Sequence, residues 1–330
     1  MSGGGGNDYV TPHVALIKDN YDFKYQKYEK PDYTNDYLTI EALEDDLTVS
    51  FSENTIQYST DNCQTWKELP EDTETPAINT GDKISFKATG LIPSWGIGTF
   101  TVNKKFNLKG NVMSMLFGDE GKNSYDLTGY NYAFYDLFCD CTTLQSVSKD
   151  FLPATTLAES CYNNMFCECT SLVNAPELPA TTLTRDCYGY MFCECTSLVN
   201  APELPATTLD EYCYQGMFYD CKSLTTAPEL PATTLANRCY ESMFNGCTSL
   251  VTAPELPATA LADYCYYEMF NGCTSLNYIK ALFTTEPSSS YTGNWVGGVS
   301  PTGTFVKNAA ATWDVTGSNG IPEGWTVETA

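Results

Sequence analysis

Residues 161–183 read CYNNMFCECTSLVNAPELPATTL, and residues 187–209 read CYGYMFCECTSLVNAPELPATTL. The two segments differ at only two positions, and the same pattern continues along the chain. A methionine followed by phenylalanine recurs every 26 residues, at Met165, Met191, Met217, Met243 and Met269. Fixed periods of about 20 to 50 residues are typical of stacked repeats, in which each unit buries its apolar face only against its neighbours. The sequence therefore predicts five or six stacked units.

Cysteine follows the same period, and 14 of the 15 cysteines lie in the repeats. One column holds Cys161, Cys187, Cys213, Cys239 and Cys265, a second holds Cys141, Cys169, Cys195, Cys221, Cys247 and Cys273, and a partial third holds Cys139, Cys167 and Cys193. Free cysteine packs as a small apolar side chain, so regular columns favour buried thiols. Disulfides between neighbouring columns and thiolate-bound zinc are the less favoured alternatives. The third column is predicted to lie nearer the surface, because Asn245 and Asn271 continue it.

The apolar spacing within a repeat predicts a short helix. Leu183, Cys187 and Met191 follow the i, i+4, i+8 pattern of one helix face. Thr208-x-x-Glu211 has the pattern of a capping box that would begin such a helix, and Gly246 suits its end. The CTSLVNAPELP segment that follows is short and extended in character. Each coil is therefore predicted to contain one helical turn and one extended segment.

The motif MFxxCTSL, followed by LPATTL and a return to CYxxMF, resembles the BspA-like leucine-rich repeat family of bacterial surface proteins over residues 130–283. This resemblance implies an α+β fold class, with a leucine-rich-repeat solenoid of 26-residue coils, and it suggests adhesion. One segment, residues 175–179, departs from the family pattern because it is one residue longer and carries an extra proline, Pro176. Proline cannot donate a ladder hydrogen bond, so the strand there is predicted to be short or irregular.

The chain outside the repeats divides into further segments. Residues 1–36 are predicted to be a flexible N-terminal arm or linker, and residues 37–118 alternate in the β manner and predict a small β-sandwich-like domain. The predicted solenoid covers residues 119–283. Residues 284–330 leave the period and are predicted to form the C-terminal cap that a repeat stack needs.

The charge balance excludes some partners. The net charge is −24, and an acidic surface repels phosphate backbones and anionic lipids, so we expect no nucleic acid as a partner. No run of 18 apolar residues is present, so we expect no membrane insertion. The N-terminal sequence lacks the features of a signal peptide. The predicted location is extracellular or on a virion surface, reached by lysis or after removal of a leader.

Few residues could carry catalysis. The single histidine, His13, lies in the N-terminal segment, which excludes Ser-His-Asp and Cys-His arrangements and most zinc hydrolases. The glutamates of the APELP segments follow the repeat, whereas a catalytic carboxylate pair would break it, so we expect solvated positions at Glu177, Glu203, Glu229 and Glu255. The prediction is a protein without catalytic residues, cofactor or metal.

Positions that vary between otherwise near-identical coils are the best candidates for a binding face. Surface tyrosines give a large contact area at low entropic cost and stack on sugar rings. The candidate ligand-binding residues are Tyr190, Tyr212, Tyr219, Tyr264 and Tyr267. Neutral variation of solvated positions stays open as the alternative for each tyrosine taken singly.

These observations predict a non-enzymatic recognition or structural protein displayed outside the cell. The favoured setting is a bacteriophage virion fibre or decoration subunit that binds a host-surface protein or glycan through its repeats. Residues 1–36 would then contact a virion or self-assembly partner. The alternative is a secreted surface adhesin of the Bacteroidales type, and a carbohydrate-active enzyme is the least favoured function.

Overall fold

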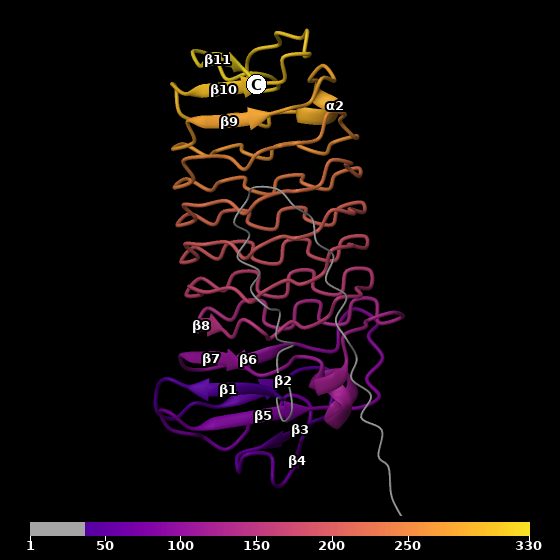
Figure 1. Cartoon of the computed structure of the whole chain (residues 1–330). Helices are drawn as coiled ribbons and strands as arrows, with labels where there is room; N and C mark the ends of the chain where they lie inside the picture. Colours follow the sequence, from indigo (N-terminus) through magenta and orange to yellow (C-terminus); the bar gives the residue numbers. More distant parts are fainter. Residues whose placement is uncertain (1–36) are drawn as a thin grey trace, which may run out of the picture. The chain divides into compact units, whose positions relative to one another are not determined.

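The computed structural model describes residues 37–330, and the predicted N-terminal arm, with His13, lies outside the described residues. The first part of the described chain is rich in short strands (Figure 1). These are β1 (Leu38–Ala42), β2 (Val49–Phe51), β3 (Ile56–Ser59), β4 (Lys67–Leu69), β5 (Lys83–Lys87), β6 (Phe100–Val102) and β7 (Phe106–Lys109). A four-residue helix, α1 (Ser114–Phe117), and a 3-10 helix, η1 (Gly118–Asn123), follow.

These strands form a mixed six-stranded sheet and a two-stranded sheet. The larger sheet has the order β4-β3-β5-β1-β7-β8, in which β8 (Leu144–Val147) comes from the first repeat and pairs in parallel with β7. The smaller sheet pairs β2 with β6. Alternating apolar residues bury one face of β1, as the sequence pattern predicts. The ring of Phe100 on β6 lies 5.1 Å from Phe86 on β5 and 5.0 Å from Phe138 in the first repeat, so strands and repeats share one core.

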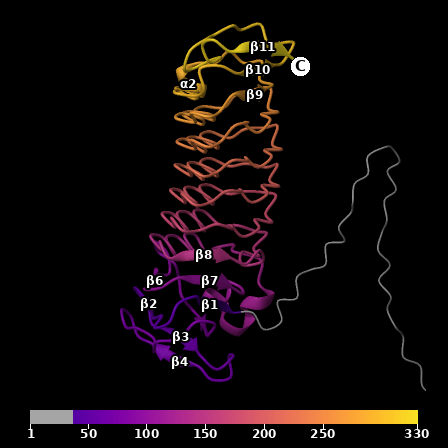
Figure 2. The ribbon, with the colours of Figure 1, turned by 90° about the vertical axis from the view of Figure 1, so that its left-hand side faces the viewer.

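The repeats lie one above another and contain turns in place of helices (Figures 1 and 2). Along each turn segment, backbone N–H groups donate alternately to the next repeat and to a residue of the same repeat. The N–H of Tyr188 donates to Cys213 in the next repeat at 3.1 Å, and that of Gly189 donates back to Asp186 at 3.3 Å. The N–H of Tyr190 again donates to the next repeat, to Gln215 at 2.7 Å. Half of the turn amides therefore join neighbouring repeats.

Every fourth residue of the turn segment has a left-handed backbone. In one repeat these residues are Asp186, Tyr190 and Glu194, with φ of 55°, 51° and 57°. Equivalent residues in other repeats share this conformation: Ser160, Asn164, Glu168, Tyr212, Gly216, Asp220, Arg238, Ser242, Gly246, Tyr264, Glu268 and Gly272. Each four-residue unit is thus one turn, which places side chains four apart on the same inner face.

The predicted α+β class, with a leucine-rich-repeat solenoid of helix-containing coils after a β-sandwich-like domain, is wrong. The regular secondary structure of residues 37–330 is mostly sheet, and the α-helices are four residues long. The extended segments meet only at isolated parallel bridges such as Asn174 with Asn200, so the repeats build no continuous sheet. A helix would bond its N–H groups within the coil, whereas here every second one bonds the next repeat. Gly246, expected to end a helix, is instead a left-handed turn residue with φ of 76°.

Ladders of identical side chains fill the repeats. The buried rings of Tyr162, Tyr188, Tyr214, Tyr240 and Tyr266 stack at 5.8 to 6.0 Å between centroids. Thiols of the second cysteine column donate to phenylalanine carbonyls of the preceding repeat, as from Cys195 to Phe166 at 3.1 Å. The predicted burial of the first two cysteine columns is confirmed, and all fifteen cysteines, which lie within residues 37–330, are thiols. In the third column, Cys139 and Cys167 are half-buried and Cys193 is buried.

The repeat register continues past the end of the sequence period. Strands β9 (Tyr278–Ala281), β10 (Thr304–Lys307) and β11 (Thr326–Thr329) form a parallel sheet, and α2 (Ser289–Thr292) precedes β10. The N–H of Phe270 donates to Trp295 at 2.8 Å, as it would to the next repeat. A second ladder stacks phenylalanine rings, as between Phe244 and Phe270 at 5.8 Å. The buried Trp295 ring lies 6.3 Å from Tyr266 and 6.1 Å from Phe270, so it covers the ends of the tyrosine and phenylalanine ladders.

Candidate functional site: a cluster of tyrosine and arginine

Three left-handed residues of successive repeats lie in register on the surface. The N–H of Tyr212 donates to Asn237 at 3.2 Å, and that of Arg238 donates to Asp263 at 2.9 Å. The N–H of Tyr264 donates to the Ser290 carbonyl of α2 at 2.6 Å. Their side chains are half-exposed. Because one backbone ladder holds all three, their spacing is set by the stacking of the repeats.

Arg238 lies between two tyrosine rings. Its guanidinium carbon is 4.3 Å from the centroid of Tyr264 and 5.6 Å from that of Tyr212. Its Nη1 donates to Glu241 Oε2 at 2.8 Å, and this bond raises the pKa of the arginine. Tyr267 meets Tyr264 edge to face at 5.7 Å. We call these five side chains the tyrosine–arginine cluster.

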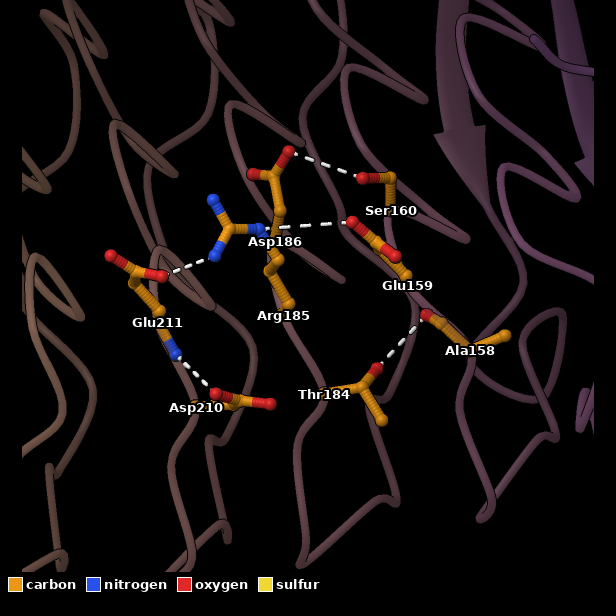
Figure 3. Close-up of polar contacts among 8 residues, drawn as sticks. All are labelled: Ala158, Glu159, Ser160, Thr184, Arg185, Asp186, Asp210 and Glu211. Atoms are coloured by element: carbon orange, nitrogen blue, oxygen red, sulfur yellow. Dashed lines mark hydrogen bonds and ion pairs between the residues drawn. The ribbon is translucent and has the colours of Figure 1, made fainter.

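The second arginine, Arg185, lies near Tyr212, at the N-terminal end of the cluster. Its guanidinium carbon is 5.0 Å from the centroid of Tyr212. Figure 3 shows the side chain between two carboxylates of the neighbouring repeats: Nη1 pairs with Glu211, and Nε lies 3.7 Å from Glu159 Oε1. Surface ion pairs are individually weak, so the main effect of these contacts is to orient the guanidinium.

Beside Arg185, Asp186 holds a strained polar position. Its Oδ2 accepts a hydrogen bond from the Ser160 hydroxyl at 3.2 Å, whereas its buried Oδ1 accepts none (Figure 3). Burial raises the pKa of this carboxyl group. A Cβ atom on Gly189 would lie 2.1 Å from Oδ1, so a larger residue there would require the Asp186 side chain to move. The negative charge of this carboxylate is therefore poorly solvated, and burial favours the neutral, protonated form.

The five tyrosines predicted from the sequence do not all meet. Tyr212, Tyr264 and Tyr267 belong to the cluster, whereas no ring contact within residues 37–330 joins Tyr190 or Tyr219 to it. A Cβ atom on Gly216 would lie 2.3 Å from the Tyr190 ring, so that ring lies close against the next repeat. Burial raises the pKa of both Tyr190 and Tyr219. Whether any of the five binds a ligand stays a prediction.

The candidate residues chosen from the sequence did not include the two arginines or Trp95. Arg185 and Arg238 are the only arginines of the chain, and Arg238 occupies the variable column of Tyr212 and Tyr264. That coincidence was a usable signal. Trp95 lies in a glycine-rich loop outside the repeats, and its ring is 4.9 Å from Tyr132. No repeat pattern points to that contact.

Other surfaces offer less chemistry. The APELP glutamates are exposed, as predicted, and two of them, Glu203 and Glu229, line a groove of about 390 Å³ walled by prolines. Within residues 37–330, no three His, Cys, Asp or Glu side chains are placed to hold a metal ion. The same part of the chain has no helix with the length and apolar character needed to cross a membrane.

Comparisons with known proteins add no relatives. No protein-family model matches the chain, and neither the curated proteins nor the solved structures gave a match. The resemblance to BspA-like repeats, carried by the motif alone, stays a prediction.

Proposed function

We propose that this protein is a non-enzymatic recognition module that binds a host-surface protein or glycan through the tyrosine–arginine cluster. The observation that carries the proposal is the placement of Arg238 between the rings of Tyr212 and Tyr264. Tyrosine and arginine are enriched among residues that dominate binding energy, because they combine large contact area with directed polar groups.

The backbone supports this proposal through preorganisation. The Tyr212 amide bonds the next repeat and the Tyr264 amide bonds Ser290 of α2, so the backbone of neither residue has to be ordered on binding. Cation–π contacts and the Glu241 ion pair restrict Arg238 further. A ligand therefore meets side chains whose conformational entropy is already reduced, which favours affinity.

We place this recognition outside the cell, on a bacteriophage virion as a fibre or decoration subunit. The net charge of −24 keeps such a surface soluble and away from nucleic acid. Residues 1–36, which lie outside the described residues, would provide attachment to the virion or to other copies. The resemblance to BspA-like repeats favours a secreted bacterial adhesin as the second setting.

Binding of the labelled full-length protein to a panel of intact gut bacteria tests the proposal. We expect strain-selective binding that falls about tenfold or more in the Tyr212→Ala/Tyr264→Ala double variant. Tyr219→Ala is the matched control, because that half-exposed tyrosine lies outside the cluster. Deleting the repeats is unsuitable, since β8 completes the sheet of β1 and β7. Full binding by a folded double variant would refute the proposal.

A further inference from the structure

Trp95 is the most exposed of the five tryptophans. Trp295, Trp313 and Trp325 are buried, and Trp66 lies under Lys87, whose Nζ is 4.3 Å from its centroid. The side chain of Trp95 is 72% exposed. An exposed indole does not contribute the large stabilisation that its burial would give, so the stability of the fold does not explain the position of Trp95.

The loop that carries Trp95 is firmly anchored. Ile97 is buried, and its carbonyl accepts a hydrogen bond from Asn54 Nδ2 at 2.9 Å. Gly96 has φ of 104°, and a Cβ atom there would lie 2.8 Å from the carbonyl oxygen of Tyr135. This close approach, which requires glycine, fixes the loop to the first repeat. The indole is therefore presented from a held backbone.

Two tyrosines of the first repeat extend the aromatic surface. The Trp95 and Tyr132 rings lie 4.9 Å apart with an interplanar angle of 44°, and Tyr135 meets Tyr132 edge to face at 6.1 Å. The edge of this surface is polar, since the Tyr135 hydroxyl accepts a hydrogen bond from Asn164 Nδ2 at 3.4 Å. Tyr132 is half-exposed and has φ of 59°.

The aromatic surface belongs to the same column as the tyrosine–arginine cluster. The N–H of Tyr132 donates to Glu159 in the next repeat at 2.8 Å, and Ser160, which follows it, donates to Arg185 at 3.0 Å. The same ladder continues through Asp186 to Tyr212. Trp95 therefore extends the candidate recognition face at its N-terminal end.

We propose that Trp95, Tyr132 and Tyr135 form a sugar-binding subsite that takes one pyranose ring of a host-surface glycan. A pyranose offers an apolar C–H face, which would lie on the indole and the Tyr132 ring, and hydroxyl groups at its edge. The phenol groups and the Asn164 amide provide donors and acceptors at the rim. The inference rests on the glycan branch of the proposed function and names the ligand class.

A protein partner would use the loop differently. Ile92, in the same loop, is 89% exposed. A protein docking on the loop would bury Ile92 together with Trp95, because interface cores are apolar. A sugar stacked on the rings does not need it. Ile92 therefore separates the two ligand classes.

The test is affinity electrophoresis of the full chain in native gels containing xylan, galactomannan, yeast mannan or dextran, together with a glycan array. We expect at least one glycan to bind, with affinity lowered tenfold or more by Trp95→Ala and by Tyr132→Ala. Trp95→Phe should retain part of the binding, and Ile92→Ala should retain all of it. Circular dichroism and thermal unfolding check that each variant is folded.

Several outcomes overturn the subsite. They are the absence of any glycan binding by the wild type, binding that survives Trp95→Ala, and equal loss in Ile92→Ala and Trp95→Ala. The proposed function is judged separately by the bacterial binding assay. Binding to bacteria that needs Tyr212 and Tyr264 but not Trp95 would preserve the recognition face and remove the sugar subsite.

Discussion

Replacing Glu194 with glycine is expected to stabilise the protein, which is the opposite of what a helix would show. Glu194 is exposed and has φ of 57°, and the equivalent residues Gly246 and Gly272 are glycines with φ of 76°. A left-handed conformation costs an L-residue about 1–2 kcal/mol. Glycine avoids this cost, but the greater conformational entropy of its unfolded chain lowers the stability by about 0.5–1 kcal/mol. The expected net gain from the backbone is therefore about 0.5–1 kcal/mol.

A second contribution comes from like charges in the same column. Glu194 follows Glu168 and Asp140 in successive repeats, and the hydrogen bond and negative charge of Asp140 raise the pKa of Glu168. Removing one carboxylate relieves a repulsion of about 0.3 kcal/mol at low salt. Glu194→Gly should thus raise the free energy of unfolding by about 1 kcal/mol in total.

Urea unfolding at low and high salt measures this change. Glu194→Gln removes only the charge, so its difference from Glu194→Gly isolates the backbone contribution. The converse variant, Gly272→Ala, places a Cβ atom 3.6 Å from Gly246 Cα, an ordinary contact, and should lose about 0.5–1 kcal/mol, the same net backbone contribution with the opposite sign. A loss of about 1 kcal/mol in Glu194→Gly, as in the interior of a helix, would refute the turn architecture.

Three further variants test the interior and the face. Tyr188→Phe should stabilise the protein by about 1 kcal/mol in urea unfolding, because the Tyr188 hydroxyl is buried without a hydrogen-bond partner; a loss would show that it has one. Asp186→Asn should stabilise near pH 7 and much less in acid. Burial raises the folded-state pKa of Asp186 above 3.8, so the wild type loses stability as pH rises through that pKa. A difference in stability between the variant and the wild type that does not change with pH would contradict this account. Arg238→Ala should lower the free energy of unfolding by about 1–2 kcal/mol, because it removes two cation–π contacts and one ion pair. Arg238→Lys should recover part of this loss. Equal stability of the wild type and both variants would show that these contacts do not stabilise the protein.

The repeat period and the buried columns were predictable, whereas the local backbone was misread. Leu183, Cys187 and Met191 are all buried, as expected for one face. Their spacing of four residues suits a helix and a chain of four-residue turns equally well, because both bring residues i and i+4 to one side. The distinguishing signal was the column that holds Asp220 in one repeat and Gly246 in the next. Residues that tolerate positive φ, recurring every four positions, indicate turns.

The candidate site was predictable only in part, for a related reason. Variation between repeats marks outward positions, and this signal found Tyr212, Tyr264 and Tyr267. It could not show which of them touch, because contacts across repeats depend on ring orientation. The role of Trp95 could not be predicted, because its contact with Tyr132 joins a loop of the strand region to the first repeat. Such a contact has no period in the sequence.

The turn architecture separates the residues that hold the fold from those free to vary. An interior ring such as Tyr188 stacks on a ring of each neighbouring repeat, so changing it disturbs two contacts. A left-handed outward position carries much the same backbone cost for most L-residues, since the strain lies in φ and the Cβ atom. Selection for ligand contacts can therefore change Asp186, Tyr212 or Arg238 while the interior ladders stay uniform. Near-identical repeats that differ at these positions are consistent with the recognition surface that we propose.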